Sequence, residues 1–139
     1  HSVLASCAIA GVKNRRTRDR KARDLPCLKA LLHDAAEAYI GDMIRPIKRH
    51  MHEFNMVEQT LLLAIGIRFG VELFNLPAEV KEADERMLAT EVLVLRGPPP
   101  APWNVKAEPY EGIRIREDFT PEDIKRQFLV RFNELGGKE

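Results

Sequence analysis

Apolar residues recur every three or four positions in five stretches of this 139-residue sequence, a spacing that places them on one face of an α-helix. The helices predicted in this way cover residues 1–12, 25–40, 53–69, 76–95 and 121–135. Gly41 and Gly70 follow the second and third stretches and are typical helix ends, whereas Thr120 and Pro121 form a typical helix start. The pattern therefore predicts a protein built mainly of helices.

The segments between these stretches are short or rich in proline. Residues 97–102 read Gly-Pro-Pro-Pro-Ala-Pro, which stops a helix and favours an extended connector. Residues 112–116 alternate in polarity, as a short strand does. We therefore expect an all-α helical bundle, a single domain over residues 1–139, with room for one short C-terminal β-hairpin. Because the sequence starts without Met inside a predicted helix, we also expect its N-terminus to be missing.

The overall charge is balanced. With 22 Lys and Arg against 21 Asp and Glu, the net charge of +1 gives no field that would attract nucleic acid or a membrane surface. The run from Lys13 to Arg23 is basic, with seven Lys or Arg and one Asp, and we favour a solvated connector over a nucleic-acid-binding arm. Apolar stretches are too short to predict a membrane span.

The two cysteines, Cys7 and Cys27, are too few for a disulfide framework or a zinc ribbon. Both lie among Ala and Leu in predicted helices, where a thiol behaves as a small apolar group. We expect both to be buried and reduced, which fits a protein of the cytoplasm.

The second stretch combines a core-facing side with ionisable residues. Its expected buried positions are Leu28, Leu31, Leu32, Ala35 and Tyr39. His33 and Asp34 stand among these apolar residues, and Glu37 lies one helical turn after His33 on the same face. Burying a charge without a partner costs several kcal/mol, about enough to unfold a small domain, so these residues need a partner. A metal ion would serve directly.

Two further residues complete a candidate ligand set. His1 and Asp84 lie in other predicted helices, and Asp84 occupies a core-facing position where a Leu would be expected. Together with His33 and Asp34 they offer two imidazoles and two carboxylates. This donor set suits a divalent transition metal ion such as Co, Mn, Zn, Ni or Fe without choosing among them.

Each candidate ligand also has an ordinary explanation. A lone histidine is more often hydrogen-bonded in or near the core than bound to a metal. Asp84 could form an ion pair with Lys81 or Arg86, and His1 stands at the very start of the chain. The order of the four residues, H…HD…D, carries more weight than any one of them.

That order resembles the HD-domain phosphohydrolases. The matching segments are residues 1–4 (HSVL), 32–37 (LHDAAE) and 82–88 (EADERML). Residues 41–48 (GDMIRPIK), 80–84 (VKEAD) and 87–91 (MLATE) are similar to the compact bacterial and phage branch of the family, related to 5′-deoxynucleotidases and phage dATP triphosphohydrolases. The resemblance covers about residues 1–95.

The resemblance implies an HD-domain fold with one divalent ion held by His1, His33, Asp34 and Asp84, and room for a second Mg or Mn bound with substrate. It implies that Glu37 is the general base, and that Asp42 orients the water or substrate. It also implies a homo-oligomer. The phosphate-binding positions that it suggests are Lys48 and Lys81, with Arg45 and Arg49 as helpers. Alternatively, Glu37 pairs with Lys29 or Lys48, and Asp42 caps the turn after Gly41.

The function that these roles imply is hydrolysis of a deoxynucleotide by attack of water at the α-phosphorus. We expect a dNTP triphosphohydrolase of the dATP type, because several cations near the site favour a long phosphate tail. The alternatives are a 5′-deoxynucleotidase acting on dNMPs and a non-catalytic module that binds a nucleotide or a partner. Trp103 or Tyr110 would stack on a base or, as we favour, pack in the core.

Overall fold

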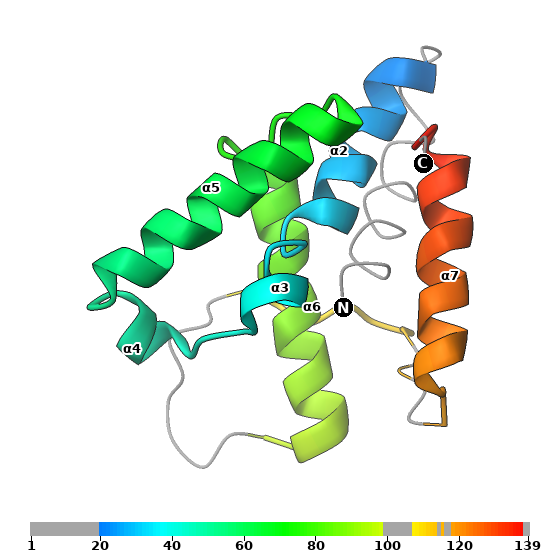
Figure 1. Ribbon diagram of the computed structural model, residues 1–139. Helices are drawn as coiled ribbons and strands as arrows, with labels where there is room; N and C mark the ends of the chain where they lie inside the picture. Colours follow the sequence, from blue (N-terminus) through cyan, green and yellow to red (C-terminus); the bar gives the residue numbers. More distant parts are fainter. Residues whose placement is uncertain (1–19, 99–106, 114, 116–117, 138–139) are drawn as a thin grey trace.

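The computed structural model describes residues 20–98, 107–113, 115 and 118–137 (Figure 1). Its helices are α2 (Arg20–Leu32), α3 (Glu37–Ile40), α4 (Arg45–Lys48), α5 (His52–Phe69), α6 (Ala78–Arg96) and α7 (Pro121–Glu134). Within those described ranges there is no strand, so the prediction of an all-α protein is confirmed. The predicted helix over residues 1–12 and parts of the predicted connector and strand lie outside the described residues.

Helix α2 lies at the centre of the described structure, packed against α6 and α7 (Figure 1). Cys27 and Leu31 of α2, Val80 of α6 and Phe132 of α7 are buried in one apolar cluster. The rings of Phe69 and Phe132 meet edge to face with centroids 5.1 Å apart, which joins the end of α5 to α7. The prediction of a buried thiol is confirmed for Cys27, whereas Cys7 lies outside the described residues.

The prediction of one continuous helix over residues 25–40 is wrong at its start and in its middle. Helix α2 already begins at Arg20 and stops at Leu32, and a turn over residues 33–36 separates it from the one-turn helix α3. In this turn the amide of Ala35 donates to the Leu32 carbonyl at 3.0 Å, a tighter i→i+3 bond than an α-helix uses. The chain changes direction there, so Tyr39 is 73% exposed instead of lying in the core.

The other helix boundaries follow the sequence signals closely. Gly70 adopts φ 65°, the left-handed conformation that ends α5 and suits glycine. Thr120 accepts a hydrogen bond from the Asp123 amide, and the Asp123 carboxylate accepts one from the Thr120 amide, which completes a capping box at the start of α7.

Helix α5 contributes little to the interior for its length. Although it has 18 residues, Gly66 is its one fully buried residue, and a Cβ at that position would lie 2.5 Å from the Val71 carbonyl oxygen. Apolar residues nevertheless lie all around the helix, a pattern that usually indicates burial on every side. None of the described helices is both long and apolar enough to cross a membrane.

Candidate metal centre

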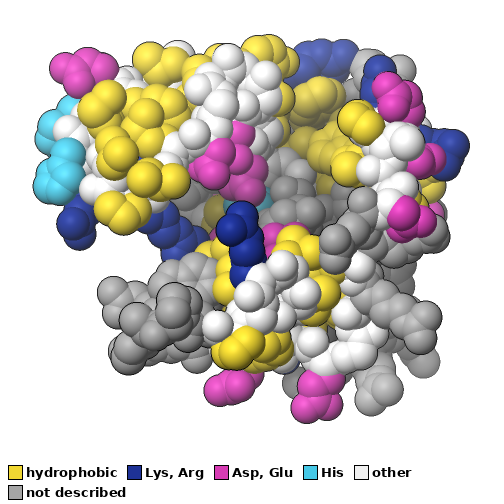
Figure 2. Space-filling model, turned by 90° about the horizontal axis from the view of Figure 1, so that it is seen from below, with side chains coloured by type: hydrophobic (Ala, Val, Ile, Leu, Met, Phe, Trp, Pro, Cys, Tyr) yellow, Lys and Arg dark blue, Asp and Glu magenta, His cyan; other side chains and the backbone are white. Residues whose placement is uncertain are grey.

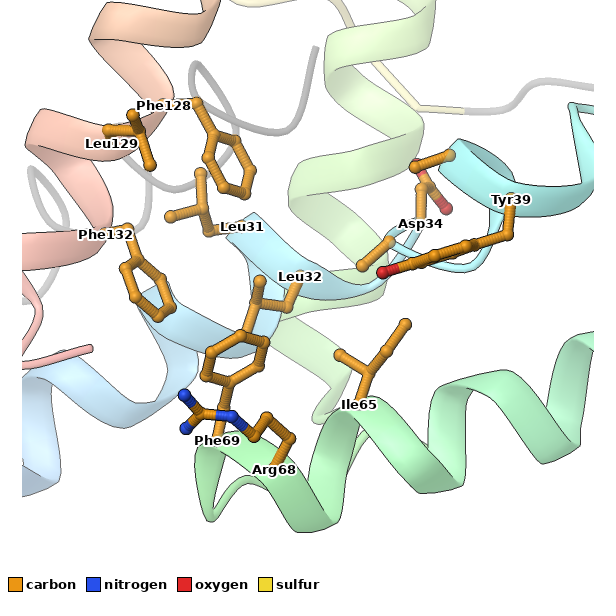
Figure 3. Close-up of a pocket in the computed structure, with 12 residues that line it drawn as sticks. Leu31, Leu32, Asp34, Tyr39, Ile65, Arg68, Phe69, Phe128, Leu129 and Phe132 are labelled. Carbon is orange, nitrogen blue, oxygen red and sulfur yellow. The ribbon is translucent and has the colours of Figure 1, made fainter. Parts of the chain in front are cut away.

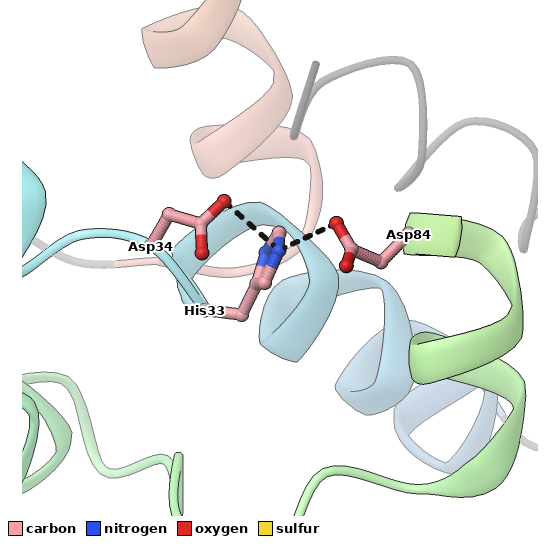
Figure 4. Close-up of side chains that lie close together, drawn as sticks. All are labelled: His33, Asp34 and Asp84. Atoms are coloured by element: carbon pink, nitrogen blue, oxygen red, sulfur yellow. Dashed lines mark hydrogen bonds and ion pairs between the residues drawn. The ribbon is translucent and has the colours of Figure 1, made fainter. Parts of the chain in front are cut away.

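Three of the four predicted ligands lie together where α2 ends against α6. The Nε2 atom of His33 is 3.0 Å from Oδ2 of Asp34 and 3.0 Å from Oδ1 of Asp84 (Figure 4). One potential ligand atom from each of the three residues lies within 4.8 Å of the others. Packing of α2 on α6 therefore joins residues that are 51 positions apart in the sequence.

The turn after α2 fixes the orientation of the His33 ring. Because Nδ1 of His33 donates a hydrogen bond to the Ala30 carbonyl at 3.0 Å, the other ring nitrogen, Nε2, points to the two carboxylates. A metal-bound histidine almost always makes such a second hydrogen bond, which selects the tautomer and holds the ring. The break that sequence periodicity missed therefore positions the histidine of the HD pair.

The electrostatics of the cluster favour a positive charge beside the two carboxylates. Burial opposes protonation of His33, but hydrogen bonds and attraction to Asp34 and Asp84 outweigh it and raise the pKa of the imidazole to about 10. In this structure the proton on His33 supplies the positive charge. A divalent ion would supply it equally well and would displace that proton.

The donor set and its spacing fit a divalent metal ion. One imidazole nitrogen and two carboxylates are ligands that Mn, Fe, Co, Ni and Zn all accept. Ligands held about 2.1 Å from an ion lie about 3.0–3.4 Å from one another in octahedral or tetrahedral geometry. The separations of 3.0 Å from the His33 nitrogen to each carboxylate fall in this range. His1, the fourth predicted ligand, lies outside the described residues.

Glu37 stands near the cluster at the start of α3 and is half-buried. Burial raises the pKa of its carboxyl, and the negative charges of Asp34 and Asp42 raise it further, to about 7. Lys48 opposes this shift without cancelling it. A carboxyl that titrates near neutral pH is suited to take a proton from water, so the geometry accommodates the predicted general base. Asp42 is exposed just after Gly41.

The predicted phosphate-binding lysines differ in their surroundings. Lys48 forms an ion pair with Glu58 at 2.5 Å, and its Nζ atom lies 5.8 Å from the centre of the Phe54 ring. Lys81 is exposed on α6, three residues before Asp84. Both phosphate-binding roles stay predictions, and for Lys48 substrate phosphate would have to compete with Glu58.

A third cation lies at the ligand cluster itself. The guanidinium of Arg45, at the start of α4, is 3.9 Å from Oδ2 of Asp84. The sequence suggested Arg45 only as a helper, on a par with Arg49. The geometry gives Arg45 the stronger claim to a phosphate oxygen, because a guanidinium can bind two oxygens at once.

Several ordinary explanations from the sequence can now be weighed. Lys29 pairs with Glu72 at 2.8 Å, which does not support its pairing with Glu37. Arg86, the suggested partner of Asp84, donates to the Glu108 carbonyl and lies over the Tyr110 ring at 4.1 Å. This contact supports packing instead of base stacking for Tyr110. Trp103 lies outside the described residues.

Glu58 is a residue of this region that sequence reasoning missed. It lies on the side of α5 that faces the molecule and pairs with Lys48, and its negative charge also raises the pKa of Glu37. No signal in the sequence could have found it, because apolar residues on every side of α5 do not reveal which side faces inward. The hydrogen bond from His33 to the Ala30 carbonyl was also missed, because every residue has a backbone carbonyl and the sequence does not single this one out.

A largely apolar pocket adjoins the ligand cluster (Figure 3). Its volume is about 550 Å³, and Asp34 and Tyr39 stand on one side of it across from the phenylalanines of α5 and α7. Arg68 is the other charged residue of its wall. Because Asp34 belongs both to the pocket and to the cluster, a molecule bound at the cluster has apolar space next to it.

Comparisons with known proteins give relatives of unassigned activity. The chain is 34% identical over 113 residues to the uncharacterized protein YfdR of Escherichia coli K12, a match that covers 77% of this chain and 60% of that protein. It is 42% identical over 57 residues to the uncharacterized protein RCAP_rcc00048 of Rhodobacter capsulatus, which covers 40% of this chain and 29% of that protein. The chain thus spans less than two thirds of the length of these relatives.

No family model matches the sequence, and no solved structure matches it. The resemblance to HD-domain phosphohydrolases therefore stays a prediction.

Proposed function

We propose that this protein is a metal-dependent phosphohydrolase of the HD-domain type that acts on deoxynucleotides. One observation carries the proposal: His33, Asp34 and Asp84 present three ligand atoms within 4.8 Å of one another. The neighbouring Glu37, with its pKa near 7, supplies the second requirement of hydrolysis, a group that can accept a proton from water.

The residues divide the work as follows. A bound divalent ion would polarise a phosphoryl oxygen and lower the pKa of a water molecule. His33, Asp34 and Asp84 would hold the ion, and the hydrogen bond from His33 to the Ala30 carbonyl keeps the ring in place. Glu37 accepts the proton of the attacking water, and Arg45 offers positive charge to the phosphate beside Asp84.

The length of the phosphate tail is the finer part of the proposal. We favour a dNTP triphosphohydrolase, which would release a deoxynucleoside and triphosphate, because Arg45, Lys48 and Lys81 all lie on or next to the segments that carry the site. The pocket of about 550 Å³ next to Asp34 offers room for the nucleoside part. One observation favours a 5′-deoxynucleotidase instead: Lys48 is already paired with Glu58, which reduces the charge left for a longer tail.

The assay that separates these functions uses product analysis. The protein is incubated with each dNTP and each dNMP in the presence of Mn²⁺ or Co²⁺, and the products are resolved by chromatography. Inorganic triphosphate supports the favoured reaction, and phosphate released from dNMPs alone favours the nucleotidase. No turnover of any nucleotide with any divalent ion would refute both and leave a binding module as the remaining interpretation. We place the protein in the cytoplasm, consistent with the buried thiol of Cys27.

A further inference from the structure

Two cations on one turn of helix stand at the edge of the ligand cluster. Arg45 and Lys48 are three residues apart in α4, a spacing that places side chains on the same side of a helix. The Arg45 guanidinium lies 3.9 Å from Oδ2 of Asp84, and the positive charge of Lys48 acts on the carboxyl of Glu37. Figure 2 shows Lys and Arg side chains beside the exposed histidines at the left, where α4 meets α5. Both cations are therefore placed to attract the phosphates of a bound nucleotide.

Lys48 differs from Arg45 because a carboxylate already neutralises its charge. Its Nζ atom donates to Oε1 of Glu58 at 2.5 Å, across the contact between α4 and α5. The Lys48 side chain is 28% exposed and that of Glu58 is 16% exposed, so little water screens the pair. The Arg45 side chain, in contrast, is 69% exposed. Asn55 supports the pair, since its Nδ2 atom donates to the Lys48 carbonyl at 3.0 Å and ties α4 to α5.

The Glu58 carboxylate has Lys48 alone to balance its charge. Within the described residues, no other group donates a hydrogen bond to it or forms an ion pair with it. The pair of Lys29 with Glu72 shows the contrast, because Glu72 is 50% exposed and also accepts a hydrogen bond from the Asn75 amide at 2.6 Å. A phosphate that drew Lys48 away would leave Glu58 as a mostly buried carboxylate without a partner, which is costly.

We propose that Glu58 sets the length of phosphate tail that the site prefers, by competing with the tail for Lys48. This inference rests on the proposed function and adds the residue that separates its two candidate reactions. A monophosphate needs positive charge at the ion and at Arg45, whereas the further phosphates of a triphosphate need another cation. Because Glu58 holds Lys48, it lowers the preference of the site for deoxynucleoside triphosphates over monophosphates.

The test compares dATP with dAMP in steady-state kinetics with Mn²⁺. Glu58→Gln nearly keeps the size of the side chain and removes its charge, so it releases Lys48. We expect it to raise the ratio of kcat/KM for dATP to kcat/KM for dAMP about tenfold, the gain of one charge-assisted contact. The ratio is measured because any effect of Glu58 on Glu37 acts on both substrates alike. The matched control is Glu53→Gln, the same change at an exposed acid of α5, which should leave the ratio unchanged.

A second background tests whether the effect depends on Lys48. In Lys48→Met, Glu58→Gln should change the ratio less than about twofold, because no lysine is left to release. An equal rise in both backgrounds would mean that Glu58 acts only through its own charge, and it would overturn the competition. An unchanged ratio in Glu58→Gln alone would overturn it as well, and so would a lower ratio, which would mean that Glu58 positions Lys48 for the tail. Circular dichroism checks folding, and Glu58→Ala, which should give the same rise, replaces a Gln variant that does not fold.

Binding of inorganic phosphates tests the proposal apart from hydrolysis. By calorimetry in the presence of Mn²⁺, Glu58→Gln should bind inorganic triphosphate about tenfold more tightly than the wild type and inorganic phosphate with equal affinity. Equal triphosphate affinity of the two proteins would contradict the proposal. Failure of every nucleotide to turn over would refute the proposed function alone, because the triphosphate affinities still decide whether Glu58 competes for Lys48.

Discussion

The end of α2 and the exposed side of α5 depart from the usual arrangement of side chains in opposite directions. At the end of α2, His33 and its two carboxylates are drawn into a half-buried cluster against α6, where apolar residues would be expected. On α5, Met56, Leu63 and Ile67 face solvent where polar residues would be expected. Departures of this kind cost stability and tend to mark functional sites.

The difference between the two regions teaches what each one lacks. The cluster satisfies its polar atoms within the chain, but only with a positive charge held on His33. The exposed side of α5 instead leaves the apolar side chains of Met56, Leu63 and Ile67 in contact with solvent. One region gathers two carboxylates around a histidine, and the other leaves apolar side chains exposed to solvent.

The largest effect is expected for Asp84→Ala. Loss of one carboxylate ligand should lower the hydrolytic rate by on the order of a thousandfold or more, because the ion contributes several kcal/mol to the reaction and each 1.36 kcal/mol is a factor of ten. The fold should survive, since Asp34 still pairs with His33. Glu85→Ala, the removal of an exposed neighbouring acid, is the control for charge alone. Full activity in Asp84→Ala would disprove the site.

Replacement of Glu37, the proposed general base, comes next. Glu37→Gln should lower kcat by about 10²–10⁴-fold while metal binding persists, because the variant loses proton transfer and keeps all three ligands. In the wild type, kcat/KM should rise with pH and level off above about 7, since only the ionised form of Glu37 accepts a proton. A Glu37→Gln variant that keeps this rise would show that another group is the base.

Arg45 should affect substrate binding more than turnover. Arg45→Ala should raise KM for nucleotide about tenfold, the loss of roughly 1.4 kcal/mol from one charge-assisted contact. Arg49→Ala removes an exposed arginine four residues along and should change KM little. Equal effects of the two substitutions would mean that Arg45 contributes only to the general field of the surface. Steady-state kinetics on the same substrate distinguish the cases.

The last effect concerns stability in the absence of metal. The pKa of His33 is raised in the folded protein from 6.5 to about 10, so its contribution is complete below pH 6.5 and is lost as the pH rises through 10. Urea unfolding with a chelator present should therefore show stability falling over this range. In His33→Gln the fall in stability that is due to the His33 proton should disappear. An unchanged fall would show that the cluster does not hold a proton on His33.

The sequence was sufficient to predict those helices whose first and last residues are set by local signals. Helices α5, α6 and α7 begin and end within two residues of the predicted bounds, because their caps are encoded by nearby glycine, proline and threonine. The turn after α2 was not predicted, since it depends on the side chain of His33 meeting a backbone carbonyl and on contact with α6. The spacing of apolar residues along the sequence indicates neither of these two contacts.

The candidate site divides in the same way. The order of His33, Asp34 and Asp84 predicted a cluster that the structure brings together. The pairing of Lys48 with Glu58 was missed because the two residues meet across separate helices. For α5, apolar residues on every side gave no means of choosing which side faces inward. Only the arrangement of the other helices determines that the side of Gly66 is buried and that of Ile67 is exposed.

The central claim, that the cluster holds a divalent ion, is tested most directly by titrating the metal-free protein with Co²⁺ and following the visible absorption of the bound ion. We predict saturation at one ion per chain for the wild type and for the Glu85→Ala control. For Asp84→Ala we predict an affinity lower by about a hundredfold or more, the range that even supporting residues of a metal site reach. Equal binding by Asp84→Ala and the wild type, or no saturable binding by the wild type, would contradict the claim.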